Sequence, residues 1–146
     1  IETPAACMIA PELAEEVDFF SLGTNDLTQY ILSIDRESEE VAYLYNHFHP
    51  AVLRTLKTAI EAAKSAQIEI EICGEMAQDS LALPVLLGMG LERLSINPTG
   101  LGPIREIISS IDVHEAYALT FEVMDKKSAR EVELLVKDFM SKGYKY

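Results

Sequence analysis

The sequence has 146 residues, which fits one domain or part of a larger one. Acidic residues outnumber basic residues 24 to 12, and the formal charge of -12 repels a phosphate backbone, so we exclude nucleic acid as a partner. No apolar run approaches the ~20 residues that cross a bilayer, and we expect no membrane insertion.

The cysteines are Cys7 and Cys73, whose separation gives neither a disulfide framework nor a zinc-site spacing. A reducing, cytoplasmic location is therefore expected. The first residue is Ile1, and no basic region precedes an apolar stretch, so we expect the chain to begin inside a longer protein.

Short β-like runs alternate with longer helical runs, which is typical of βαβ units and a parallel sheet. The strands are predicted at residues 18–22, 69–73 and 93–96. The first and third are short and apolar, as expected of strands covered on both faces. Residues 68–73, "IEIEIC", alternate strictly, which leaves open what covers the outer face of this strand.

The helices follow the same alternation. Apolar spacing predicts a helix over residues 50–66, with Pro50 in the first turn, where no backbone donor is needed. Ser80 is expected to cap a helix over residues 81–89. Further helices are predicted over residues 104–111, 113–124 and 129–140.

Polar side chains follow each predicted strand. Asn25 and Asp26 follow the first, Cys73 ends the second and Asn97 follows the third, while Glu2 lies about one βα unit before Asp26. The carboxyl ends of parallel strands hold the ligand site in barrels and in open sheets. A barrel closes with about eight strands, so the sheet predicted here is half of a larger one.

Glu2 and Asp26 offer the hard oxygen ligands that suit Mg²⁺, which takes one or two carboxylates and completes its shell with water and substrate phosphate. The spacing leaves other interpretations open: Asp26 as a helix cap or turn residue, and Glu2 as a solvated residue.

Cys73 closes an apolar strand, and Gly74 lets the backbone turn there and expose the thiol. A free thiol is mostly protonated at neutral pH and can deliver a proton, although Cys73 could also be a buried small hydrophobe, as we expect for Cys7. Arg36 is the cation of an acidic stretch and could bind a phosphate through its planar guanidinium or pair with a neighbouring carboxylate.

Several longer motifs add a family resemblance. "IETPAA", "DFFSLGTNDLTQY", "IDR", "HPAVL", "CGEMA" and "LLGMGLERLSIN" occur in the order and spacing of enzyme I of the phosphoenolpyruvate-dependent sugar phosphotransferase system, including its nitrogen-regulatory paralogue. The chain resembles this family over essentially its whole length. Pyruvate phosphate dikinase and phosphoenolpyruvate synthase share the barrel and a reactive cysteine, but "CGEMA" is more similar to enzyme I.

The resemblance implies an α/β fold, the C-terminal half of a (β/α)₈ TIM barrel with two C-terminal helices, in which residues 1–146 form an incomplete phosphoenolpyruvate-binding domain. It implies that Glu2 and Asp26 bind Mg²⁺ and that Cys73 donates a proton to the enolate of pyruvate. The residues that it implies at the substrate are Gly23, Thr24, Asn25, Asp26 and Arg36.

Enzymes of this family transfer a phosphoryl group from phosphoenolpyruvate to a histidine of a separate N-terminal domain, release pyruvate, and pass the group to a phosphocarrier protein. They act as homodimers through the barrel. None of His47, His49 and His114 lies in the phosphohistidine motif, so we expect the isolated chain to be inactive. A dikinase or synthase fragment, and a non-catalytic half-barrel that dimerises to cover its sheet edges, remain as alternatives.

Overall fold

The computed structural model describes residues 1–143. Its centre is a 3-stranded parallel sheet of β1 (Phe19–Gly23), β2 (Glu69–Cys73) and β3 (Arg93–Leu94), in the order β1-β2-β3. The expected α/β architecture with parallel strands is therefore confirmed for this part of the chain, although β1 begins one position later than predicted and β3 is shorter.

Backbone hydrogen bonds extend the sheet on both sides. The Gly23 amide donates to the Ile1 carbonyl at 2.9 Å, and the Ile1 amino group donates to the Ser21 carbonyl at 2.6 Å. Ile1 thus lies beside β1 in the manner of a neighbouring strand. On the other side, the Ser95 amide donates to the Ile72 carbonyl at 2.8 Å, which continues the pairing beyond β3.

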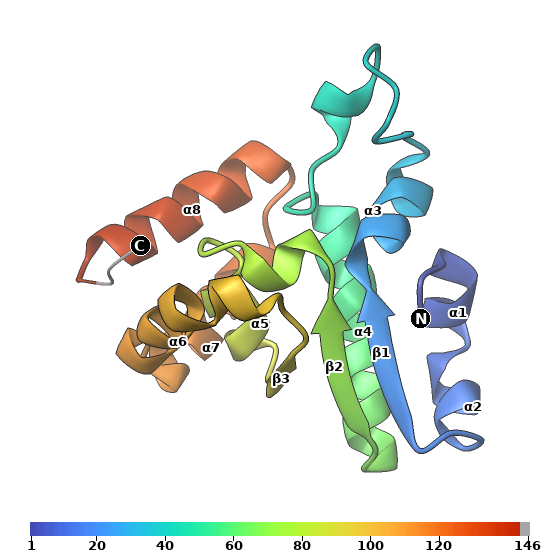
Figure 1. Cartoon of the computed structure of the whole chain (residues 1–146). Helices are drawn as coiled ribbons and strands as arrows, with labels where there is room; N and C mark the ends of the chain where they lie inside the picture. Colours follow the sequence, from blue (N-terminus) through green and yellow to red (C-terminus); the bar gives the residue numbers. More distant parts are fainter. Residues whose placement is uncertain (144–146) are drawn as a thin grey trace.

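Helix α4 (Pro50–Ala66) forms where it was predicted and lies behind β1 and β2 in Figure 1. Pro50 is in its first turn, and His49 Nδ1 accepts from the Ala51 amide at 3.1 Å, which caps the helix. The apolar face of α4 is buried, and Leu56 and Ile60 are fully inaccessible. The remaining helices of the first half are α1 (Pro4–Met8), α2 (Ala10–Ala14) and α3 (Thr24–Leu32).

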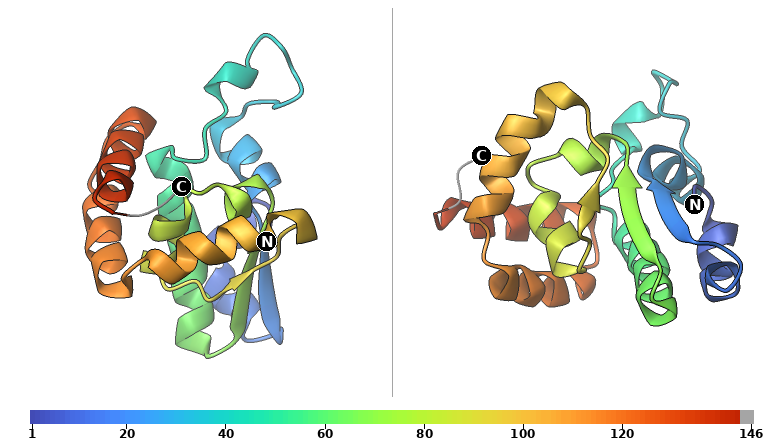
Figure 2. Two further views of the ribbon diagram at one scale, coloured as in Figure 1. Left: turned by 60° about the vertical axis from the view of Figure 1, so that its left-hand side comes forward. Right: turned by 60° about the horizontal axis from the view of Figure 1, so that its bottom comes forward.

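The second half of the chain is mostly helical. Its helices α5 to α8 gather on the far side of β2 from α1 and α2, as the right-hand view of Figure 2 shows. α7 and α8 confirm the two expected C-terminal helices. The bounds of this group are α5 (Leu83–Gly88), α6 (Leu101–Ser110), α7 (Val113–Met124) and α8 (Ala129–Ser141), and the 3₁₀ turns of the chain are η1 (Ala42–Leu44), η2 (Glu75–Gln78) and η3 (Pro98–Gly100).

The two faces of the β1–β2 pair differ. Leu22 and Ile72, which are partners in the register, are fully buried on the face toward α4. On the opposite face Phe19 is 57% exposed, and no described helix crosses this face in Figure 1. The expectation that the first strand is covered on both faces is therefore wrong for residues 1–143, because its odd-numbered side chains meet no second layer.

The start of α5 also differs from the prediction. Ser80 does not cap the helix; instead, Asp79 Oδ1 accepts from the Leu81 amide at 2.9 Å, and α5 begins at Leu83. The N-cap position of α5 is Ala82, which has no side-chain cap hydrogen bond. Within residues 1–143, every helix is too short or too polar to traverse a lipid bilayer.

Candidate functional site

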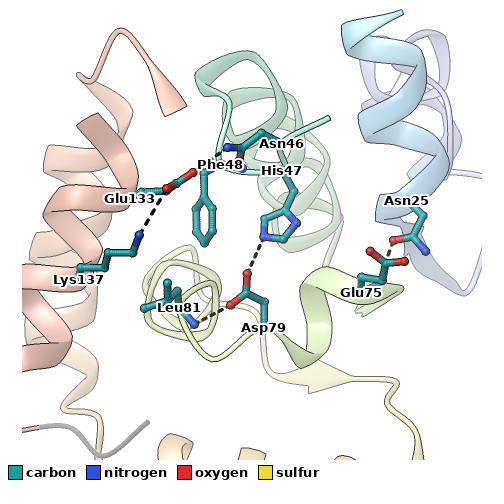
Figure 3. Close-up of polar contacts among 9 residues, drawn as sticks. All are labelled: Asn25, Asn46, His47, Phe48, Glu75, Asp79, Leu81, Glu133 and Lys137. Atoms are coloured by element: carbon teal, nitrogen blue, oxygen red, sulfur yellow. Dashed lines mark hydrogen bonds and ion pairs between the residues drawn. The ribbon is translucent and has the colours of Figure 1, made fainter. Parts of the chain in front are cut away.

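The carboxyl ends of β1 and β2 are tied together by two side chains from the first turn of α3. Thr24 Oγ1 donates to the Cys73 carbonyl at 2.8 Å, and Asn25 Oδ1 accepts from the Glu75 amide at 3.0 Å. Figure 3 shows Asn25 and Glu75 facing each other across this edge. Because α3 starts directly after β1, its first residues lie beside the turn that follows β2.

Gly74 makes this close approach possible. Its φ is +97°, which only glycine adopts without strain, and a Cβ atom there would lie 2.7 Å from Thr24 Oγ1 and 2.9 Å from Asn25 Oδ1. A side chain at Gly74 would therefore separate β2 from α3.

Glu2 lies over the end of β1. A Cβ atom at Gly23 would come within 2.6 Å of Glu2 Oε1, so glycine at this position leaves the space that the carboxylate occupies. Asp26 is half-buried in the first turn of α3, and no side chain caps that helix, so the alternative of Asp26 as a helix cap does not apply.

The donor set fits Mg²⁺ bound together with a substrate. Glu2 follows Ile1, which pairs with β1, and Asp26 follows β1 itself. Residues 1–143 hold no group of three or more His, Cys, Asp or Glu side chains that could enclose a metal. Mg²⁺ suits such a site, because it usually takes one or two carboxylates and fills its other positions with water and substrate phosphate.

Cys73 lies on the open face of the sheet and is half-buried. Its Sγ donates to the Leu22 carbonyl at 3.4 Å, and Ser21 Oγ lies 3.9 Å from Sγ and donates to Glu71 Oε1 at 2.9 Å. The thiol thus has polar neighbours and does not belong to the hydrophobic core.

Cys7 behaves in the opposite way. It is 1% exposed in α1, and burial raises the pKa of its thiol. The interpretation of Cys7 as a small core residue therefore agrees with its surroundings.

Arg36 lies in the segment between α3 and α4, which projects beyond the carboxyl ends of β1 and β2 in Figure 1. Its backbone amide donates to Gln29 Oε1 at 3.3 Å, and its guanidinium has no ion pair within residues 1–143. Asp35, a possible partner, instead accepts from the Glu37 amide at 2.9 Å. The guanidinium is therefore available to an anionic ligand.

Tyr45 is a residue of this edge that the sequence analysis missed. Its hydroxyl donates to the Asn25 carbonyl at 3.2 Å. Burial raises the pKa of the Tyr45 phenol, Glu75 and Asp26 add to this rise, and Thr28 and Arg36 oppose it. The phenol therefore lies among charged groups of the edge. No spacing signal in the sequence could have found it, because the contact joins the segment before α4 to a backbone carbonyl in the first turn of α3.

Thr28 lies on the buried side of this phenol. It is fully inaccessible, and its Oγ1 has no hydrogen-bond partner of normal geometry among residues 1–143. The hydroxyl is close enough to lower the pKa of Tyr45, but it does not hold the phenol in place as the Asn25 carbonyl does.

Beside this edge lies an open hollow of about 320 Å³. Its lining includes Asn25, Glu75, Ser95 and Asn97, which come from the ends of all three strands. The hollow is therefore polar, and it lies at the carboxyl ends of the parallel strands, where a ligand is expected.

The two histidines before α4 have structural partners. His47 Nε2 donates to Asp79 Oδ2 at 2.8 Å, while His49 caps α4. Figure 3 shows His47 pointing at Asp79, and it also shows Asn46 directed at Glu133 of α8, to which it donates at 2.7 Å. These contacts fasten the chain just before α4 to the second half of the molecule.

The predicted site residues thus divide into two groups. Glu2, Gly23, Thr24, Asn25, Asp26 and Cys73 gather at the carboxyl ends of adjacent sheet positions. Arg36 lies on the projecting segment, and its charge lowers the pKa of the Tyr45 phenol, whereas the charge of Asp26 raises it.

Comparisons with known proteins identify the family of the chain. The family model of the PEP-binding domain of PEP-utilising enzymes matches residues 1–113. The phosphoenolpyruvate-protein phosphotransferases of Bacillus subtilis and Listeria monocytogenes are each 42% identical, over 94% and 95% of this chain and 24% of their own length. The Haemophilus influenzae protein of the same name is 41% identical over 96% of this chain and 24% of its own. The chain spans about a quarter of the length of these curated relatives.

Proposed function

The chain belongs to the family of the PEP-binding domain of PEP-utilising enzymes, and from this membership we propose that it is the part of a phosphoenolpyruvate-protein phosphotransferase that binds phosphoenolpyruvate and Mg²⁺. One observation carries the proposal. Glu2 follows the extended residue beside β1, Asn25 follows β1, and Cys73 ends β2, so all three lie at one edge of the sheet. The three relatives named above favour this enzyme over a dikinase or a synthase.

The sheet supports the proposal that the whole chain forms the C-terminal half of a (β/α)₈ barrel. Its strands are parallel, Ile1 lies beside β1 as a further position, and the face that carries Cys73 has no covering layer within residues 1–143. In a closed barrel this face points inward, and the carboxyl ends form the active-site face.

Each residue then has a separate task. Glu2 and Asp26 would hold Mg²⁺, which supplies positive charge to the phosphate when bound. Asn25 and Arg36 would bind the substrate, because an amide and a planar guanidinium match its carboxylate and phosphate oxygens. Gly23 and Thr24 would keep the turn compact beside it.

The phosphoryl group would leave with cleavage of its bond to the enol oxygen and pass to a histidine of another domain, and later to a phosphocarrier protein. The remaining enolate would take a proton from Cys73 Sγ at its methylene carbon, which gives pyruvate and a thiolate. The hydroxyl of Ser21 lies 3.9 Å from this sulfur, so the thiol has a polar neighbour on the open face. The two free cysteines are compatible with a cytoplasmic location.

The test uses Cys73→Ala in the complete enzyme that carries this segment. We expect pyruvate formation to fall about 10²- to 10⁴-fold, the range of general acid catalysis, with phosphoenolpyruvate affinity nearly unchanged. Equal loss of both would make Cys73 a structural residue. The isolated chain should release no pyruvate, and detectable release would contradict the assignment of the phosphohistidine to another domain.

A second function, self-association, is favoured by one surface. α7 exposes Val113, Tyr117 and Phe121, at 61%, 68% and 68%, and their spacing places them on one helix face. We propose that this stripe contributes to a homodimer. In sedimentation experiments, the Phe121→Ser chain should associate more weakly than the wild-type chain. A wild-type chain that is monomeric would reject the idea.

A further inference from the structure

The segment between α3 and α4 carries Arg36 out from the body of the molecule and returns at Tyr45. It leaves α3 at Ser33, whose left-handed conformation (φ 55°) ends the helix. Connections of this length inside a compact domain are usually functional. The question is what fixes the position of the guanidinium.

The projecting part of the segment is exposed and forms no backbone hydrogen bond to the rest of the described chain over residues 38–44. Tyr43 is 80% exposed and Leu44 is 49% exposed. The backbone hydrogen bonds of residues 38–44 stay within the segment itself. At its upstream end, the Arg36 amide reaches Gln29 through a 3.3 Å contact. The position of Arg36 therefore depends on how the two ends of the segment are fastened.

The returning end is fastened by consecutive side chains. Asn46 binds to Glu133 of α8, and His47 binds to Asp79, the residue that follows η2, as Figure 3 shows. Tyr45 differs, because its hydroxyl donates to the carbonyl of Asn25 at 3.2 Å. This contact joins the segment that carries Arg36 directly to a residue of the proposed substrate site.

The chemistry of Tyr45 suits this task. Its phenol is rigid, with few rotatable bonds, and it is half-buried beside Thr28. Burial also raises its pKa, so the hydroxyl stays protonated and remains a donor at neutral pH. The side chain of Asn25 is engaged separately, since its Oδ1 accepts from the Glu75 amide at 3.0 Å, and the backbone carbonyl has two lone pairs, one of which can accept from the phenol.

We propose that Tyr45 is a positioning residue of the phosphoenolpyruvate site: its hydroxyl ties the returning end of segment 33–49 to Asn25 and so holds Arg36 where it meets a phosphate bound beside Asn25. This inference rests on the proposed function. Tyr45 acts through Arg36 and needs no contact of its own with the substrate.

The first experiment is Tyr45→Phe in the complete enzyme, with phosphoenolpyruvate binding measured calorimetrically in Mg²⁺. Loss of one neutral hydrogen bond corresponds to a roughly two- to tenfold weaker affinity. Tyr43→Phe is the matched control, because it removes a hydroxyl two positions away on the exposed side and should change nothing. Wild-type affinity in Tyr45→Phe would overturn the inference and leave the proposed function standing; a wild type that binds no phosphoenolpyruvate would overturn both.

A double-mutant cycle separates positioning from general stability. In the Arg36→Ala background, Tyr45→Phe should weaken phosphoenolpyruvate binding no further, because the group that Tyr45 positions is gone. Fully additive losses would overturn the inference. In this chain alone, Tyr45→Phe should increase hydrogen exchange at residues 35–44 and leave α4 unchanged; protection equal to that of wild type would contradict the tie.

Discussion

Successive residues of β1 and β2 point to opposite faces of the sheet, and the two faces differ in burial and polarity. Leu22 and Ile72 point toward α4 and are fully buried. Ser21, Glu71 and Cys73 point the other way and form a partly exposed polar group, with 2.9 Å between Ser21 Oγ and Glu71 Oε1. Because strand side chains alternate, each strand contributes to stability with one face and to the proposed chemistry with the other.

This difference explains how the site residues keep their positions although the open face of the sheet has no covering layer within residues 1–143. Burial on the α4 side fixes the register of β1 and β2, since a shift by one residue would turn the apolar side chains outward. The register then places Gly23 beside Cys73. The position of the thiol is thus set by the core face.

The sharpest test compares neighbours on one strand. Ile72→Ala should lower the free energy of unfolding by about 3–4 kcal/mol, because it leaves a cavity in the buried face. Cys73→Ala, one position later on the open face, should cost less than about 1 kcal/mol. Urea unfolding followed by circular dichroism measures both, and similar losses would show that the two faces do not differ in this way.

Gly88 tests the buried side where the helices meet. A Cβ atom there would lie 2.1 Å from the Ala116 carbonyl oxygen and 2.2 Å from Thr120 Oγ1, so Gly88→Ala must push α5 from α7. We expect a loss of about 2–3 kcal/mol. Gly102→Ala is the control, because a Cβ atom there meets nothing within 4 Å and helix propensity favours alanine. Equal unfolding midpoints for the two variants would contradict the tight contact.

A pH test concerns the contact between His47 and Asp79, which lies on neither face of the sheet. Burial alone would raise the pKa of Asp79, but hydrogen bonds from His47 and the Leu81 amide outweigh it and hold the pKa below its ordinary value of 3.8. Ionised Asp79 therefore stabilises the fold above that value, and this contribution disappears as the pH falls through the lowered folded pKa.

Asp79→Asn should accordingly cost about 1–2 kcal/mol at neutral pH, since it weakens a charge-assisted hydrogen bond. The difference from wild type should stay constant down to about pH 4 and shrink as the pH falls below 3.8 toward the lowered folded pKa. Urea midpoints across this range provide the measurement, and a difference that stays constant with pH would reject the role of Asp79 ionisation.

The smallest effect is expected on the open face itself. Ser21→Ala removes the hydroxyl that donates to Glu71, and because both groups are partly exposed, the loss should be about 0.5–1 kcal/mol. Glu71→Gln keeps an acceptor and should cost less. A loss from Ser21→Ala as large as that from Ile72→Ala would mean that the polar group, too, holds the sheet together.

Local sequence patterns predicted most of the fold. α4 and α7 begin and end where the apolar spacing places them, and β2 spans the predicted residues. The resemblance carried by the motifs also gave the positions that gather at the carboxyl ends of the strands. These features are predictable because helix and strand periodicity depends on residues that are near one another in the chain.

Other features could not be predicted locally. α5 has Ala82 at its N-cap and no side-chain cap, whereas Asp79, which His47 contacts from a distant segment, accepts from the Leu81 amide in the turn before the helix. Tyr45 joined the site through a backbone carbonyl, and a carbonyl leaves no signature in the sequence. Contacts of this kind depend on which loops the sheet register brings together.

The sequence by itself determined where the strands lie to within one or two residues, which residue types follow them, and which chemistry those types can support. Tertiary structure decided which face each side chain occupies, that the Arg36 guanidinium has no ion pair within residues 1–143, and that Tyr45 reaches Asn25. The physical reason is that periodicity is a local property of the chain, whereas burial and hydrogen-bond partners exist only after distant segments have come together.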